Sequence, residues 1–248
     1  MSNKKPIGKV PAETILRLDI DRYPKDIVEG FMALEDLTGT VSDAMDEMGL
    51  EGVVPASVLA PTLPLSRIVG PALTLRNVAQ RDNAYKGARE RVSKMAEIEA
   101  HNLAETGDVL VIEGVVGVSN MGGLSATIGQ RQGEVGAIVD GGVRDIEQQR
   151  RLGFPVWTRG VSSVTGKWRL ETVAINGTVR VCGVQVRPGD LVVADEGAVC
   201  FVPREHVQAV LKRAHEIAEG EARRYADIRA GMPVPELAMR THVYKFNT

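Results

Sequence analysis

The stretch "VGAIVDGGVRD", residues 135–145, decides how this chain folds. The apolar run from Val135 to Val139 predicts a buried strand, and the two glycines after Asp140 allow close approach of other groups. Arg144 and Asp145 then place a cation beside a carboxylate, and a helical turn follows in "IEQQRRLGF". The pair is either part of a strand-to-helix turn, with Asp145 as the N-cap, or part of a site for a small charged ligand.

Strand and helix signals continue on both sides of this stretch. Buried strands are predicted for "SRIVGPALTLRNV", "GDVLVIEG" and "PVWTRG", and a short helix for "GGLSATIGQRQG". One helix is expected from residue 82 to near Gly107, and another in "TGTVSDAMDEMGL" with Thr40 or Ser42 as its N-cap. Asn176-Gly177 predicts a two-residue hairpin, and residues 203–231 predict a long charged helix. Together these patterns indicate an α/β protein.

Composition excludes several classes of function. The 248 residues suggest one large domain, or one domain with extensions. A net charge of −2 and 4% aromatic residues give no sign of a nucleic-acid partner. Two cysteines are too few for a disulfide framework or a cysteine metal cluster, and the four histidines, His101 among them, share no metal-ligand spacing. No signal region and no membrane-length apolar run are recognisable, so we expect a cytoplasmic protein with no membrane partner.

Two strand-helix junctions carry the residues suited to chemistry. Gly123 precedes Arg144 by 21 positions, and both follow predicted strands, so they can meet at one edge of a sheet. The N–H groups of Leu124 and Ser125 would face an anion there. Arg144 offers a planar fork for a carboxylate, and Asp145 offers a hard oxygen ligand for Mg²⁺ or Mn²⁺. Such a site could hold an α-keto acid; alternatively, the glycines serve packing and the Arg–Asp pair is a solvated surface feature.

Eight stretches follow one another along the chain: "TVSDAMDEMGL", "RIVGPALTL", "GDVLVIEG", "GGLSATIG", "GAIVDGGVRD", "FPVWTRG", "GVQVRPGDLVVADEGAVCFVP" and "EGEARRYADIRAG". Together they resemble the RraA-like family, which includes the class II pyruvate aldolases acting on 4-hydroxy-4-methyl-2-oxoglutarate and 4-carboxy-4-hydroxy-2-oxoadipate. The family signature is G-x20-R-D-x2-E/D. This chain matches it with Gly123, Arg144 and Asp145, but has Gln148 in the acidic position, next to Glu147.

The resemblance implies a swivelling β/β/α fold with a long C-terminal helix. The chain would divide into a helical N-terminal extension (1–36), an RraA-like catalytic domain (37–231) and a C-terminal tail (232–248). The resemblance also implies a homotrimer or homohexamer, with a metal-dependent site between subunits.

The resemblance assigns roles to particular residues. Asp145 would contact Mg²⁺ or Mn²⁺, Arg144 would bind the pyruvyl group, and the Leu124 and Ser125 amides beside Gly123 would hold the carboxylate.

Two further positions belong to the expected shell of the metal. Glu221, from the C-terminal helix of a neighbouring subunit, aligns best with the glutamate that completes the water shell, although Glu216 and Glu219 lie nearby. Gln148 occupies the place of the usual carboxylate.

These roles predict a divalent-metal-dependent carbon–carbon lyase. It would decarboxylate oxaloacetate, cleave 4-hydroxy-2-oxo diacids by a retro-aldol step, or do both, with release of pyruvate. The alternative is a non-catalytic RraA-like protein that modulates a ribonuclease or another enzyme. Family members of that kind lack the aspartate after the arginine, so Asp145 favours chemistry.

Overall fold

The structure is a computed structural model that describes residues 4–240; residues 1–3 of the expected extension and 241–248 of the expected tail lie outside it. Its main sheet runs in the order β1-β12-β11-β3-β4-β6-β7-β2, with β5 beside β6 and β8 beside β3. The strands are β1 (Val53–Pro55), β2 (Ala60–Pro61), β3 (Ile68–Ala79), β4 (Val109–Glu113), β5 (Ser119–Met121), β6 (Gly136–Val143), β7 (Val156–Val161), β8 (Leu170–Ile175), β11 (Leu191–Ala194) and β12 (Ala198–Val202). A separate antiparallel pair consists of β9 (Val179–Val181) and β10 (Val184–Val186).

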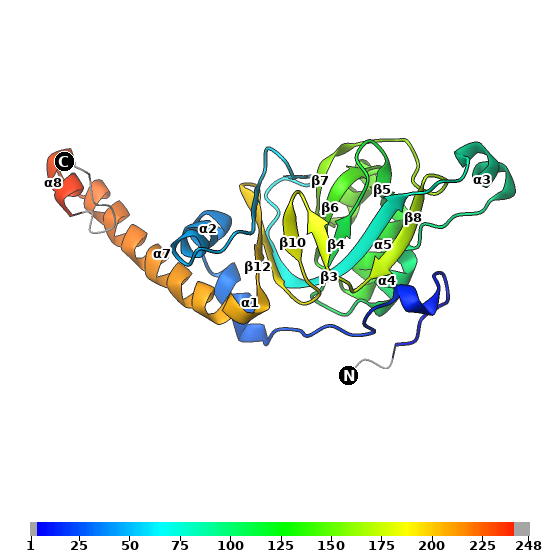
Figure 1. Cartoon of the computed structure of the whole chain (residues 1–248). Helices are drawn as coiled ribbons and strands as arrows, with labels where there is room; N and C mark the ends of the chain where they lie inside the picture. Colours follow the sequence, from blue (N-terminus) through cyan, green and yellow to red (C-terminus); the bar gives the residue numbers. More distant parts are fainter. Residues whose placement is uncertain (1–3, 241–248) are drawn as a thin grey trace.

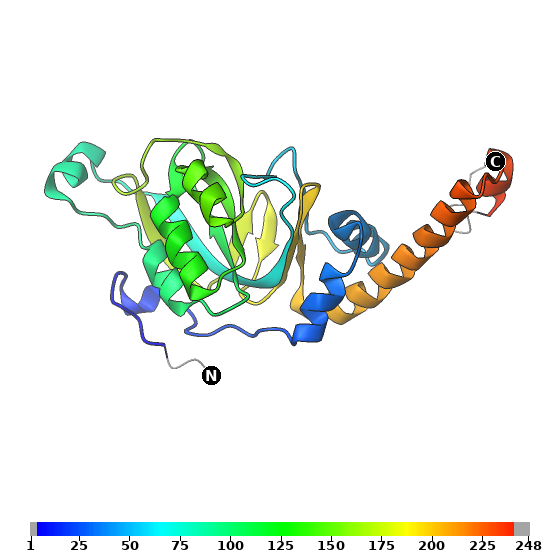
Figure 2. The same ribbon diagram turned by 180° about the vertical axis from the view of Figure 1, so that it is seen from behind.

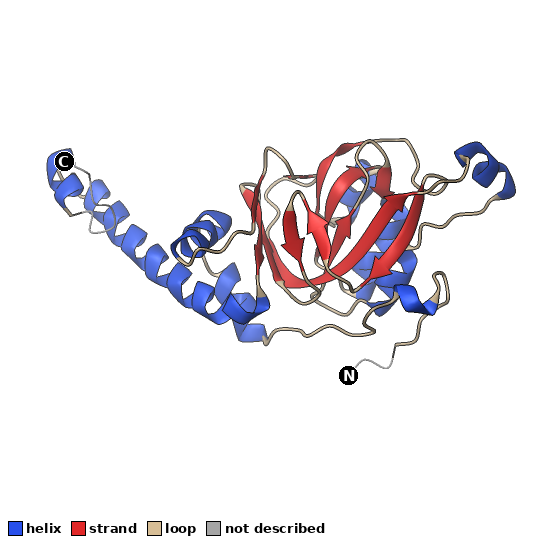
Figure 3. Cartoon of the chain, viewed as in Figure 1, coloured by secondary structure: helices blue, strands red, loops and turns tan. Residues whose placement is uncertain are grey.

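Helices cover one face of this sheet and one of its ends (Figures 1 and 3). The α-helices are α1 (Lys25–Met32), α2 (Leu37–Glu47), α3 (Ala84–Glu90), α4 (Glu97–Leu103), α5 (Gly123–Gln132), α6 (Ile146–Leu152), α7 (Val207–Arg229) and α8 (Val234–Met239), of which α3 and α8 project away from the sheet. Figure 2, the view from behind, shows the green helices α4, α5 and α6 against the sheet. The strands β3, β4, β6 and β7 pair in parallel, and burial on both faces explains their continuous apolar runs.

Strand β3 joins the two halves of the sheet. Its first residues, Ile68 to Pro71, pair with β11, and from Ala72 onward it pairs with β4. A side chain at Gly70 would overlap the carbonyl oxygen of Gly107, so a glycine is needed at this crossing. The predicted α/β fold with a long C-terminal helix is confirmed as a mixed α/β architecture around one mixed sheet.

Three local predictions are wrong for physical reasons. The helix expected from residue 82 to 107 is two helices, because Arg91 adopts a left-handed conformation (φ 57°) that ends α3. Helix α2 begins earlier than expected: Asp36 is its N-cap and accepts a hydrogen bond from the Gly39 N–H at 3.2 Å. The Asn176-Gly177 turn connects strands of different sheets, since β8 pairs with β3 while β9 pairs with β10.

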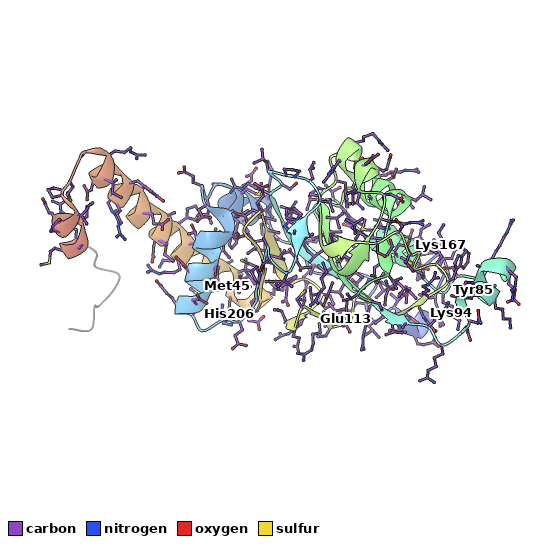
Figure 4. The ribbon with its side chains drawn as sticks, turned by 90° about the horizontal axis from the view of Figure 1, so that it is seen from above. Met45, Tyr85, Lys94, Glu113, Lys167 and His206 are labelled. Carbon is purple, nitrogen blue, oxygen red and sulfur yellow. The ribbon has the colours of Figure 1, made fainter. Side chains whose placement is uncertain are left out.

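The molecule is elongated, with projections at both ends. Figure 4 labels Tyr85 and Lys94 at the α3 end, and Met45 and His206 at the end that carries α7. The 23-residue α7 projects beyond α1 and α2 and ends beside α8 (Figure 1). None of the helices in the described part of the chain is long and apolar enough to cross a membrane.

Candidate functional site

The pairing of β5 with β6 brings the two predicted strand-helix junctions together. Met121 lies opposite Val143 in this parallel pair, and the N–H of Arg144 donates to the Met121 carbonyl at 3.1 Å. The residues that follow, Gly123 on α5 and Asp145 before α6, are therefore neighbours. The expected meeting at one edge of the sheet, beyond the end of β6, is present in the structure.

Asp145 holds the two junctions together. Its carboxylate Oδ2 accepts a hydrogen bond from the Gly123 N–H at 3.0 Å and lies 3.6 Å from Nε of Arg144. Its backbone is left-handed (φ 58°, ψ 39°), a conformation that aspartate adopts more readily than most residues. Asp145 occupies the N-cap position of α6 but makes no side-chain cap bond there, so its side chain caps α5 instead. The prediction that Asp145 is an N-cap was correct about its position before α6, but the helix that its side chain caps is α5.

The paired glycines leave room for these side chains. A Cβ added at Gly122 would lie 3.0 Å from Asp145 Oδ2 and 3.1 Å from Arg144 Nε. A Cβ at Gly123 would lie 3.0 Å from Cγ of Gln148. The glycines at positions 122 and 123 therefore have a steric reason: a side chain at either position would push against Arg144, Asp145 or Gln148.

The first turn of α5 has two open donors. Helix bonding begins at the Ala126 N–H, which donates to Gly122, and Asp145 takes the Gly123 N–H. Within residues 4–240 the Leu124 and Ser125 N–H groups meet no hydrogen-bond acceptor. Leu124 is 76% exposed, whereas the Ser125 side chain is buried and turned away. Backbone donors at a helix N-terminus favour an anion.

A cavity of about 580 Å³ lies beside these groups, lined by Gly123, Leu124, Thr127, Asp145, Gln148 and Arg151 among others. Oε1 of Gln148 accepts a hydrogen bond from Arg151 at 2.9 Å, and Glu147 lies 3.8 Å from the same guanidinium. The structure thus brings Gln148 and Glu147 to the cavity, where Arg151 partners both. Another cavity of about 580 Å³ lies near α2, but the Asp195 carboxylate there is already bound to Thr38 and Gly197.

Glu97 was not among the site residues predicted from the sequence. Burial raises the pKa of its carboxyl group, while the positive charges of Lys167 and Arg144 act to lower it. Glu97 stands at the start of α4, in the electrostatic surroundings of Arg144. In the sequence it is only a glutamate in the first turn of a helix, and such a glutamate is usually a solvated charge.

His101 was also not predicted to belong to a cluster of polar side chains. It is fully buried and hydrogen-bonded to Ser125 and Glu134, which lie 24 and 33 positions away in the sequence. His215 contacts the Gly30 carbonyl, and His206 precedes α7. Among the described residues no three His, Cys, Asp or Glu side chains come close enough together to hold a metal ion.

Other candidate side chains are engaged elsewhere. Arg159, on β7, forms an ion pair with Asp140 at 2.6 Å. Burial raises the pKa of Cys182 to about 11 and that of Cys200 to about 12, so neither supplies a thiolate at neutral pH.

Glu221 is not brought to Arg144 by the fold of one chain. It is exposed on the distal part of α7, and Figures 1 and 2 show α7 projecting away from α5. Among the described residues of one chain, two carboxylates line this cavity: Asp145, which is hydrogen-bonded to the first turn of α5, and Glu147, which is paired with Arg151.

The comparisons with known proteins concern most of the chain. Residues 38–200 match the model of the RraA-like family, described as Aldolase/RraA. A protein of Halalkalibacterium halodurans, "Putative 4-hydroxy-4-methyl-2-oxoglutarate aldolase", is 33% identical over 192 residues, covering 76% of this chain and 83% of that protein.

Two crystal structures share the fold. RraAS2 of Streptomyces coelicolor, described as an unusual member of the RNase ES inhibitor RraA family, is 28% identical with a TM-score of 0.65, covering 82% of this chain and 98% of that one. An uncharacterised protein of Pseudomonas syringae pv. tomato gives a TM-score of 0.73 at 24% identity, covering 90% of this chain and 98% of that one.

Proposed function

Because this chain belongs to the RraA-like family, we propose that it is a divalent-metal-dependent carbon–carbon lyase that acts on pyruvyl-type keto acids. The proposal rests on one observation above all: Arg144 and Asp145 lie at the first turn of α5, beside two open backbone donors. A relative at 33% identity that carries an aldolase name supports the same direction. We further propose that residues 37–231 form the catalytic domain.

The chain's own groups suit a 2-oxo acid. The Leu124 and Ser125 N–H groups would bind the substrate carboxylate, which needs several donors on one side. The Arg144 guanidinium would lie near the keto oxygen. Cleavage of the bond beta to a ketone leaves negative charge on that oxygen, and a fixed cation stabilises such charge as it develops.

The donor set also fits Mg²⁺ or Mn²⁺. Hard cations of this kind are held by one or two carboxylates and keep several waters. Asp145 uses only Oδ2, for the Gly123 N–H, and its side chain is half exposed. Glu221 of a neighbouring copy would be the second carboxylate, so the site needs at least two copies, and we propose that they belong to a trimer or hexamer. A bound cation would polarise the keto group as a Lewis acid.

Gln148 bears on the choice of reaction. Retro-aldol cleavage needs a group to accept the proton of the substrate hydroxyl, whereas decarboxylation needs none. A neutral amide, already bound to Arg151, stands where the family signature has a carboxylate. This favours decarboxylation of oxaloacetate over aldol cleavage.

Pyruvate release tests the proposal. Metal-stripped protein should be inactive toward oxaloacetate and 4-hydroxy-4-methyl-2-oxoglutarate, and should regain activity with Mg²⁺ or Mn²⁺. Pyruvate can be measured by a coupled dehydrogenase assay, with metal-only blanks because oxaloacetate decomposes on its own. Equal activity in excess chelator would contradict the metal requirement.

A second function has one observation in its favour. RraAS2, 28% identical, is described as a member of an RNase ES inhibitor family. Failure of every such keto acid with metal present, together with inhibition of a ribonuclease, would favour this binding role.

A further inference from the structure

A buried chain of hydrogen bonds lies beneath the first turn of α5. Oε1 of Glu134 is 2.7 Å from Nδ1 of His101, and Nε2 of His101 is 2.7 Å from the Ser125 hydroxyl. His101 is fully buried, and Ser125 and Glu134 are each 4% exposed. The three side chains come from α4, from α5 and from the turn before β6, so the hydrogen bonds join three separate segments.

The fold makes room for these polar groups at a cost. A Cβ at Gly129 would lie 2.6 Å from Oε2 of Glu134 and 3.2 Å from Cε1 of His101, so a side chain at this position of α5 would displace the Glu134 carboxylate. Glycine lowers helix stability relative to alanine. Within the described structure Oε2 of Glu134 also has no hydrogen-bond partner. Apolar side chains would fill this space more favourably, so stability alone does not account for the three polar residues.

The order serine, histidine, acid matches the arrangement of a hydrolase triad. A nucleophile must reach its substrate, and the Ser125 hydroxyl does not. Ser125 is only 4% exposed, and unlike Gly123, Leu124 and Thr127 it does not line the neighbouring cavity, whereas the Arg144 side chain, also absent from that lining, is 32% exposed. The geometry therefore fits a group that holds the helix, not one that attacks a substrate.

The hydrogen bond from Ser125 holds the first turn of α5, which carries the unbonded Leu124 and Ser125 N–H groups. Serine early in a helix can turn its hydroxyl toward its own backbone. Here the Nδ1–H of His101 donates a hydrogen bond to Glu134, so Nε2 can accept a hydrogen bond from the Ser125 hydroxyl. This bond keeps the hydroxyl pointing inward. The Ser125 backbone is thereby fixed, and the Leu124 and Ser125 N–H groups stay directed outward.

We propose that Glu134, His101 and Ser125 are positioning residues that set the first turn of α5 for binding the substrate carboxylate. The proposal rests on the function proposed above. It assigns a role to a buried cluster whose three side chains contact one another and not Asp145, and would not contact the substrate.

Two variants of Ser125 test the role directly. Ser125→Ala removes the hydroxyl, and Ser125→Thr keeps it. In the full-length, metal-loaded protein, Ser125→Ala should weaken pyruvate binding, and raise KM for oxaloacetate more than it lowers kcat, by about 3- to 10-fold, the effect of one hydrogen bond. Ser125→Thr should lie nearer to the wild type. Pyruvate affinity of Ser125→Ala within twofold of the wild type would overturn the proposal.

A fully apolar replacement separates positioning from stability. Ser125→Ala/His101→Leu/Glu134→Val should keep or raise Tm, because apolar groups replace a buried polar cluster, yet bind pyruvate more weakly. A variant that is as stable and binds pyruvate as tightly as the wild type would overturn the proposal.

Amide hydrogen exchange at Gly123 and Ala126, whose N–H groups donate the hydrogen bonds of this turn, gives a readout that needs no activity. Exchange should be faster in Ser125→Ala than in the wild type. Unchanged exchange would overturn the positioning role even in an active enzyme. A wild type that binds no pyruvate and cleaves no keto acid, despite normal exchange, would instead contradict the proposed function.

Discussion

Asp145 serves two purposes that a substitution can separate. Its carboxylate caps α5 through the Gly123 N–H, and its backbone is left-handed. Asparagine tolerates the same conformation and can accept the same hydrogen bond. Asp145→Asn therefore removes the charge and retains the local structure, which Asp145→Ala would not do.

Arg144 and Asp145 should fail differently. We expect Asp145→Asn to keep its free energy of unfolding within about 0.5 kcal/mol of the wild type but to weaken Mn²⁺ binding, since a neutral amide is a poorer ligand for a hard cation. Arg144→Ala should keep Mn²⁺ affinity and lose turnover, and Arg144→Lys should restore little, because an ammonium cannot replace a planar fork. Calorimetric titration and initial rates measure both. If both variants retain near-normal turnover, the pair is structural.

At the scale of residues, sequence predicted the participants better than their contacts. The meeting of Gly123 with Asp145 followed from strand-helix junctions, because parallel strands end at one edge of a sheet. The capping of α5 by Asp145 did not, because it depends on how β5 pairs with β6. His101 was missed because its partners are distant in sequence. The roles of the site residues remain predictions.

One ion pair joins the N-terminal extension to the central sheet. The Arg22 guanidinium donates to both carboxylate oxygens of Asp108, at 2.9 and 2.8 Å, just before β4. Asp108 is fully buried, and burial raises its pKa although the bonds from Arg22 act to lower it. The expected extension is therefore packed onto the sheet by a charge pair.

Arg22→Ala should destabilise the protein by about 2–4 kcal/mol at neutral pH, because it leaves a buried charge without its partner. The pKa of Asp108 should rise further, so the folded state takes up a proton that the unfolded state releases. The penalty is then largest above the folded pKa and shrinks as pH falls through it.

Urea unfolding of wild type and variant at about pH 7.5 and pH 5 measures this change. Arg17→Ala is the matched control, since Arg17 is an exposed arginine of the same extension and should change stability by less than about 0.5 kcal/mol. A penalty that is equal at both pH values would contradict the account.

At the scale of elements, regular patterns were predictable and interruptions were not. The apolar runs of β4 and β6 identified buried strands correctly. The break between α3 and α4 depends on the left-handed backbone conformation of Arg91, which could not be predicted from an arginine in the sequence. The Asn176-Gly177 turn has the expected sequence, but pairing of β8 with β3 overrides the hairpin.

At the scale of the whole molecule, α7 and α8 form an arm whose apolar side chains are exposed to solvent in a single copy of the chain. Tyr225, Ile228, Val234 and Met239 are between 48% and 84% exposed on it. Glu221 belongs to α7, which projects away from α5 in the same chain (Figure 1). A site that uses both residues therefore needs two copies.

Mixed subunits test the shared site. Arg144→Ala and Glu221→Ala should each be inactive alone. Equal mixing with subunit exchange should restore about a quarter of wild-type activity, because one interface in four then carries both intact residues. No rescue despite demonstrated exchange, or a fully active monomer, would count against a site between subunits.

The central claim is that this chain stabilises a pyruvyl enolate with the help of a divalent metal at Arg144 and Asp145. Exchange of the methyl protons of pyruvate with D₂O, followed by proton NMR, measures this step without knowledge of the physiological substrate. We predict exchange by the wild type with Mg²⁺ or Mn²⁺, and none above the metal-only blank in chelator or in Arg144→Ala. Exchange that is equal with and without metal, or absent in the metal-loaded wild type, would contradict the account.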